Sequence, residues 1–153
     1  MLHGLALAFA VATPANPAKV MILGVAHLDR ARFVNAQLEG SNFSRTGLES
    51  ADFGSAELLG SNLRDSDARN ANFQNAVVCS DDTTTVNDHG ARSVFVGKTD
   101  CVNLDGTNLR GANFTGARHC VWLGNNTAPR CKPATAAMLQ EYGHANLSGS
   151  IGL

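Results

Sequence analysis

Large aromatic side chains and charges are scarce in this sequence of 153 residues. It contains one Trp, one Tyr and seven Phe, and only 16% of its residues are charged. So few large side chains do not fill an ordinary layered core, and a regular arrangement must compensate. The net charge of -1 argues against a nucleic-acid binder with a basic face and against a densely acidic mimic of nucleic acid.

Long apolar runs and catalytic motifs are lacking as well. No apolar run reaches the length of a transmembrane helix, so we expect no membrane span. The sequence has no Gly-x-Ser-x-Gly motif, phosphate-binding loop or His-Glu-x-x-His motif. No pair of acidic residues is forced together for acid and base catalysis. We therefore predict that the chain is not an enzyme and binds no cofactor.

The N-terminus has the pattern of a secretory signal. An apolar run over residues 5–11 is followed by small residues and by Thr13-Pro14-Ala15, as in a signal peptide and its cleavage region. Only the amino terminus and His3 precede the run. We predict a signal peptide over residues 1–15 and an N-terminal cap over 19–25. A frayed apolar tail or the remnant of a longer precursor is the alternative.

Residues 26–80 repeat with a period of five, in eleven consecutive blocks. The first residue of each block is Ala, Ser or Thr, and the fifth is Gly, Ser, Asn or Asp in all blocks except those ending in Arg30 and Arg45. The third residue is always apolar. These central residues are Leu28, Phe33, Leu38, Phe43, Leu48, Phe53, Leu58, Leu63, Ala68, Phe73 and Val78.

A period of five fits neither an α-helix nor a continuous strand, so the chain must turn within every block. In extended backbone the first and third residues point to the same side, and the second points away. The residue types at the fifth position are those that form corners at low cost. The pattern therefore predicts a coil of short straight sides around a narrow core.

The blocks Ala51-Asp52-Phe53-Gly54-Ser55 and Ala71-Asn72-Phe73-Gln74-Asn75 resemble the pentapeptide-repeat family, as does Ser61-Asn62-Leu63-Arg64-Asp65. The resemblance implies an all-β fold, a right-handed quadrilateral parallel β-helix with four blocks in each coil. It also implies stacks of residues twenty apart. These stacks are Phe33, Phe53 and Phe73; Leu28, Leu48 and Ala68; Leu38, Leu58 and Val78; and Phe43 and Leu63.

The repeat is interrupted after Ser80. We predict an insertion loop over residues 81–101 and a second repeat array over residues 102–119. The central residues Val78 and Leu104 are separated by five blocks plus one residue, so a loop or bulge must absorb the difference. The predicted structural core comprises Leu28, Phe33, Leu38, Phe43, Leu48, Phe53, Leu58, Leu63, Phe73, Leu104, Leu109 and Phe114.

Four cysteines flank the irregular segments. None lies in a Cys-x-x-Cys pair, and His89 and His119 do not complete a zinc-site spacing, so we predict no metal. We favour disulfides because each would fasten an excursion to the coil, although free buried thiols in a cytosolic protein are the alternative. The favoured pairs are Cys79 with Cys101 and Cys120 with Cys131.

The C-terminal cap is predicted over residues 120–153. Pro133 begins and Gly143 ends a stretch of helical composition, with Ala134, Met138, Leu139 and Tyr142 on one face. We expect this short helix to cover the open end of the coil. One further repeat unit follows over residues 145–149.

The leading functional prediction is a non-catalytic solenoid in a secreted, periplasmic or lumenal space, where it binds a protein partner or forms a homo-oligomer. It binds no nucleic acid. The resemblance implies an alternative, because some pentapeptide-repeat proteins mimic duplex DNA and modulate the topoisomerase DNA gyrase. Residues 26–80 carry five arginines and seven acidic residues, a charge of -2, which is little for mimicry. A hydrolase built on a β-helix is a third hypothesis.

Overall fold

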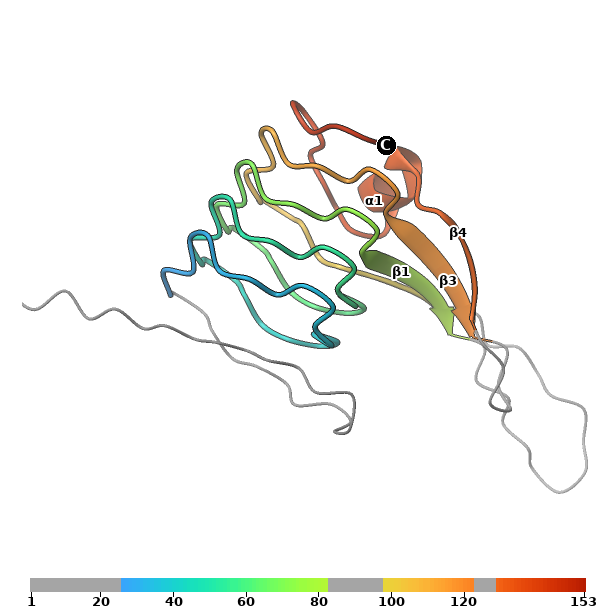
Figure 1. The fold of residues 1–153 in the computed structure, drawn as a ribbon. Coiled ribbons are helices and arrows are strands. Elements are labelled where there is room, and N and C mark those ends of the chain that lie inside the picture. Colours follow the sequence, from blue (N-terminus) through green and yellow to red (C-terminus); the bar gives the residue numbers. More distant parts are fainter. Residues whose placement is uncertain (1–25, 83–97, 123–128) are drawn as a thin grey trace, which may run out of the picture.

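The computed structural model describes residues 26–82, 98–122 and 129–153. The predicted signal peptide and N-terminal cap lie outside the described residues, as do residues 83–97 of the predicted insertion loop. The described chain winds in stacked coils, with a small sheet on one side and the C-terminus at one end (Figure 1).

Parallel bridges between residues twenty apart connect successive coils. In the first pair of coils they are His27 with Gly47, Arg32 with Asp52, Gln37 with Glu57 and Asn42 with Asn62. Leu28 N–H donates to the Gly47 carbonyl at 2.7 Å, and Gly47 N–H donates back to the Ala26 carbonyl at 2.9 Å. Each coil therefore takes four blocks, and the array is a β-helical solenoid that pairs its backbone groups as parallel strands do.

Each of the ten blocks over residues 26–75 turns at its fourth and fifth residues. The fifth residue has a positive φ, for example 64° at Gly40 and 59° at Ser50. Arg30 and Arg45, the exceptions in the sequence pattern, adopt the same conformation, with φ of 62° and 57°. Gly, Asn and Asp enter this left-handed region most easily, which explains their frequency at the corner.

The first and third residues of the blocks form the core. All twelve predicted core residues are at most 5% exposed. Phe33, Phe53 and Phe73 stack with ring centroids 4.9 and 5.0 Å apart, and Phe114 extends the stack at 4.7 Å. Phe43 packs edge-on against Phe33 and Phe53. The small first residues leave room for these large third residues.

The second array continues directly from the coil that precedes the interruption. Asn62 pairs with Asn103, 41 positions later, instead of with a residue twenty positions later. The interruption therefore adds one coil length and one further residue. The register between the flanking strands shifts between Val77 and Cys79, where a bulge takes up one residue.

A four-stranded mixed sheet extends from one side of the solenoid. It consists of β1 (Val77–Asp82), β2 (Lys98–Cys101), β3 (Arg118–Trp122) and β4 (Arg130–Pro133), in the order β2-β1-β3-β4. β1 and β3 are parallel, and β2 and β4 return antiparallel beside them. Both ends of the predicted insertion loop are therefore strands, because β2 pairs back onto β1 (Figure 1).

The helix α1 (Ala136–Glu141) lies over the last coil and is shorter than predicted. Pro133 belongs to β4, and Thr135 caps the helix by accepting the Met138 N–H. Leu139 is fully buried, whereas Tyr142, predicted to share a face with it, is 44% exposed. Tyr142 is the C-cap, where the chain leaves the helix and no longer follows its face. After α1, Ile151 bridges Asn113 and begins a further coil.

Candidate functional site

Outward Asn and Asp side chains at the second position of the blocks stabilise the corners. The Oδ1 atoms of Asn42, Asp52 and Asn62 each accept the N–H of the residue two positions later, at 3.0 Å. Asn72 also donates to Asp52 Oδ1 at 2.8 Å, which connects two coils. These residues act as turn-forming side chains, so their abundance does not mark a reactive site.

Charged residues at one corner form a ladder across the coils. Arg45 Nε lies 4.0 Å from Asp65 Oδ2, and Arg64 Nε lies 3.6 Å from the same oxygen. Arg64 Nε also lies 3.4 Å from Asp105 Oδ2. All four side chains are largely exposed, so each pair contributes at most about 1 kcal/mol. The two basic and two acidic side chains of the ladder balance each other in charge, so the ladder has no strong field of one sign.

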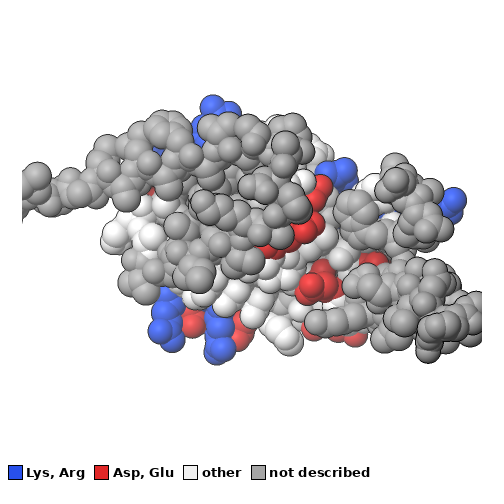
Figure 2. Space-filling view, turned by 90° about the horizontal axis from the view of Figure 1, so that it is seen from below, with Lys and Arg blue, Asp and Glu red and all other residues white. Residues whose placement is uncertain are grey.

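A second charged group surrounds Arg69. Its Nε donates to Asp67 Oδ1 at 2.9 Å, and its Nη2 donates to Glu49 Oε2 at 3.1 Å. The hydrogen bond and negative charge of Asp67, followed by the charge of Glu49, raise the pKa of the Arg69 guanidinium. Basic and acidic side chains alternate along one edge of the visible surface in Figure 2.

Glu39 and Glu57 face each other on neighbouring coils. Partial burial raises the pKa of the Glu39 carboxyl, and the charge and hydrogen bond of Glu57 raise it further. Within the described ranges, no group of three His, Cys, Asp or Glu side chains has an arrangement that could hold a metal ion. The Glu39–Glu57 pair is thus a local site of like-charge repulsion.

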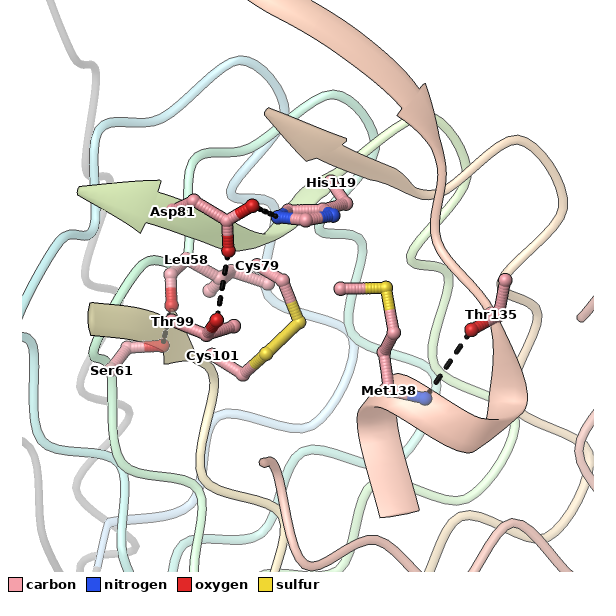
Figure 3. Close-up of a disulfide and its surroundings, with 9 residues drawn as sticks. All are labelled: Leu58, Ser61, Cys79, Asp81, Thr99, Cys101, His119, Thr135 and Met138. Atoms are coloured by element: carbon pink, nitrogen blue, oxygen red, sulfur yellow. Dashed lines mark hydrogen bonds and ion pairs between the residues drawn. A yellow bond between two sulfur atoms is a disulfide. The ribbon is translucent and has the colours of Figure 1, made fainter. Parts of the chain in front are cut away.

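A polar network joins three strands of the projecting sheet (Figure 3). Thr99 Oγ1 on β2 donates to Asp81 Oδ1 on β1 at 2.8 Å. His119 Nε2 on β3 lies 3.1 Å from Asp81 Oδ2. His119 is only 2% exposed, and its Nδ1 has no hydrogen-bond partner among the described residues. This network brings a hydroxyl, a carboxylate and a buried imidazole from three strands together.

The order of groups in this network does not activate a nucleophile. In a hydrolytic triad the imidazole lies between the hydroxyl and the carboxylate, so that it takes the proton from the hydroxyl. Here Asp81 lies between Thr99 and His119, and the Thr99 hydroxyl donates to the carboxylate. The arrangement can hold the register of β2, β1 and β3, but it provides no base for Thr99.

Two disulfides fasten the outer strands of the sheet. Cys79 on β1 bonds to Cys101 on β2, and Cys120 on β3 bonds to Cys131 on β4. Each pair is directly opposite in the strand register. No free cysteine is present among the described residues. The cysteines therefore close the two excursions and leave no thiol for metal binding or catalysis in that part of the chain.

The sequence alone does not reveal the Asp81–Thr99–His119 network. Its members come from three strands that are distant in sequence, and none belongs to a recognisable motif. Their juxtaposition follows from the pairing of β1 with both β2 and β3.

The described part of the chain contains no helix long and apolar enough to cross a membrane.

The repeats that the sequence pattern predicts are also found by comparison with family models. Residues 48–78 and 100–118 match the model for pentapeptide repeats, with eight copies. A search of curated protein sequences found no match.

Several solved structures resemble the chain. HetL from the cyanobacterium Nostoc sp. strain PCC 7120, a pentapeptide repeat protein involved in heterocyst differentiation regulation, is 23% identical with a TM-score of 0.29. The match covers 63% of this chain and 37% of HetL. A pentapeptide repeat protein from the Arabidopsis thaliana thylakoid lumen is 22% identical, with a TM-score of 0.27 and coverage of 63% and 55%. Trypsin-treated QnrB1, a plasmid-mediated fluoroquinolone resistance protein, is 18% identical, with a TM-score of 0.28 and coverage of 65% and 72%.

Proposed function

Because the chain carries pentapeptide repeats, we propose that it is a non-catalytic interaction module, a right-handed, four-sided β-helix whose flat outer faces bind a protein partner. One observation carries this proposal. The outward Asn and Asp side chains form corner turns, and the charged side chains form ion pairs between coils. The array is thus a rigid scaffold, and solenoids use such extended surfaces for binding.

The two disulfides support a secreted, periplasmic or lumenal location. Disulfides persist in oxidising compartments and are rare in the cytosol. The apolar run and small residues over 5–15 agree with export through a signal peptide. Together these features favour a partner in an extracytoplasmic space.

Intact mass spectrometry tests the location. Protein recovered from its host should lack the signal peptide, and reduction should add two hydrogens for each of two disulfides. Full-length protein with four free thiols would contradict the proposed compartment. It would leave the interaction role open, so the two parts of the proposal are tested separately.

Photo-crosslinking tests the interaction role. A photoreactive amino acid is placed at each corner of one coil, in separate variants at Leu59, Arg64, Arg69 and Gln74. We expect discrete crosslinks to a protein from one or two adjacent corners, because a flat face contacts a partner on one side. Absence of protein crosslinks from all four variants in intact cells would contradict the proposal. The same four variants without irradiation provide the negative control.

A supercoiling assay with purified protein and DNA gyrase distinguishes the topoisomerase alternative. We expect neither inhibition nor protection from quinolones at micromolar protein, because the Arg45–Asp65 and Arg64–Asp105 pairs offset the acidic charge. Inhibition or protection would favour the DNA-mimicking gyrase modulator instead.

A further inference from the structure

The two disulfides lie on opposite faces of the projecting sheet. In the parallel register of β1 and β3, Cys79 is paired with His119, and Cys120 is paired with Ser80. Side chains of paired residues share a face, and neighbours along a strand point to opposite faces. Cys79–Cys101 is therefore on the face of Asp81 and His119, and Cys120–Cys131 is on the other.

The two faces differ in their protection from solvent. Cys79 and Cys101 are 0% and 7% exposed. Met138 of α1 points toward this disulfide in Figure 3 and packs against the core that contains it. Cys120 is also buried, but Cys131 lies on the edge strand β4, whose residues are all exposed. A thiol in solution can thus approach Cys131 far more easily than any other cysteine.

We propose that the Cys120–Cys131 disulfide is a site of thiol–disulfide exchange with a dithiol reductant, and that its reduction loosens the C-terminal segment, residues 134–153. A reductant thiolate attacks Cys131 Sγ, the S–S bond breaks, and Cys120 leaves as a thiolate that takes a proton. The second thiol of the reductant then attacks the mixed disulfide and releases Cys131. The dithiol is oxidised by two electrons to its disulfide, and two cysteine thiols are formed.

The C-terminal segment is attached to the solenoid through β4 and through its own hydrogen bonds to the last coil. Ala134, directly after β4, donates its N–H to the Ala117 carbonyl at 2.8 Å. Further along, Leu104 N–H donates to the Gly143 carbonyl and Phe114 N–H donates to the Ile151 carbonyl. The disulfide closes a short loop, with a sequence separation of 11, and so restricts the start of this segment. Without it, β4 is a four-residue edge strand that opens locally more often.

Loosening of the segment has a consequence for the other disulfide. Because α1 belongs to the segment and Met138 packs against the core that contains Cys79–Cys101, opening of the segment would uncover that disulfide to the same reductant. The two disulfides are then reduced in a fixed order. The exchange depends only on the two disulfides, so it stands apart from the proposed partner and compartment.

Timed reduction of the folded wild-type protein tests the order. Dithiothreitol is added, samples are alkylated at intervals, and labelled peptides are quantified by mass spectrometry. We expect labels on Cys120 and Cys131 to appear at least about ten-fold faster than on Cys79 and Cys101. Equal rates, or faster labelling of Cys79 and Cys101, would overturn the proposal.

A double variant tests the structural consequence. In Cys120→Ser/Cys131→Ser we expect hydrogen exchange in peptides of residues 134–153 to rise about ten-fold, while residues 46–75 keep their protection. Dithiothreitol should also reduce Cys79–Cys101 faster in this variant than in the wild type. The matched control is Cys79→Ser/Cys101→Ser, which should leave residues 145–153 protected. If hydrogen exchange in residues 134–153 is as slow in Cys120→Ser/Cys131→Ser as in the wild type, the proposed loosening is wrong.

Discussion

At the scale of single residues, the repeat gives each position of the block a separate physical task. The first residue is small and inward, the third fills the core, and the second forms a turn through its side chain. The fifth residue accepts a left-handed backbone, as at Ser50. Deviations from these tasks identify the residues at which substitution should change stability most clearly.

Ser66 is a small inward residue whose hydroxyl is buried without a hydrogen-bond partner among the described residues. We predict that Ser66→Ala raises the free energy of unfolding by about 1 kcal/mol, because it removes the desolvated hydroxyl. The matched variant Ser61→Ala should lower it by about 1 kcal/mol, because Ser61 Oγ donates to the Leu58 carbonyl at 2.8 Å. Urea denaturation checks both. The same sign of change in the two variants would contradict this account.

Glu39 has a raised pKa, so the folded state binds its proton more tightly than the unfolded state. Its contribution to stability is therefore present at low pH and is lost as pH rises through the raised pKa. We predict that Glu39→Gln raises stability at neutral pH by less than about 1 kcal/mol, since solvent screens this partly exposed pair. Thermal melts from pH 4 to 8 should show a flatter profile. A steeper decline with rising pH in the variant would refute the assignment.

At the scale of elements, the Phe stack and the edge strand show how the solenoid builds and protects its sheets. Phe33, Phe53, Phe73 and Phe114 form one column through four coils.

The edge strand β4 is protected against pairing with another strand. The Cα atoms of Cys120 and Cys131 are 4.0 Å apart, typical of a non-hydrogen-bonded pair. The backbone groups of Cys131 thus face the open edge of β4. Residues two positions away in the chain direct their backbone groups to the same edge. These residues are Pro129 and Pro133, which lack an N–H and therefore discourage the addition of another strand.

The middle of the Phe column should tolerate truncation poorly. We predict that Phe53→Ala lowers the free energy of unfolding by about 3 to 5 kcal/mol, because it leaves a cavity between two stacked rings. Phe53→Leu should cost less because more of the volume is kept. Val34→Ala, at a 38% exposed position, serves as the control and should have little effect. An unchanged melting temperature in Phe53→Ala would exclude the stacked core.

At the scale of the whole molecule, each coil is stabilised mainly by its contacts with the neighbouring coils. Each coil contacts its neighbours through bridges such as Asp52–Asn72 and Asn72–Asn113. Repeat proteins of this kind behave as one-dimensional arrays with nearest-neighbour coupling. The sheet β1–β4 and the C-terminal segment add longer connections at one end (Figure 1). Damage at one end should therefore remain largely local.

Leu48 and Leu109 allow a matched test, because both are buried third-position residues of one column, on opposite sides of Ala68. We predict that Leu109→Ala costs about 2 to 5 kcal/mol and raises hydrogen exchange mainly in residues 102–122. Leu48→Ala should instead raise exchange mainly in residues 41–60. Uniform exchange across the chain in both variants would indicate a single cooperative unit.

Several features could be predicted from residue spacing. A side chain recurring at every fifth position can face inward only if the chain turns in each block, and this identified the core from Leu28 to Phe114. Corner residues were predictable because few residue types accept a positive φ. The end of α1 was not, because the exposure of Tyr142 depends on how the chain leaves the helix.

The amino-acid sequence by itself determined the coil, since the same local chemistry is repeated in every block and needs no distant partner. Only the tertiary structure decided the sheet β1–β4, the Asp81–Thr99–His119 network and the unequal exposure of the two disulfides. These features arise where segments far apart in the chain pair across two excursions. Such pairing depends on the register of whole strands, which no short motif encodes.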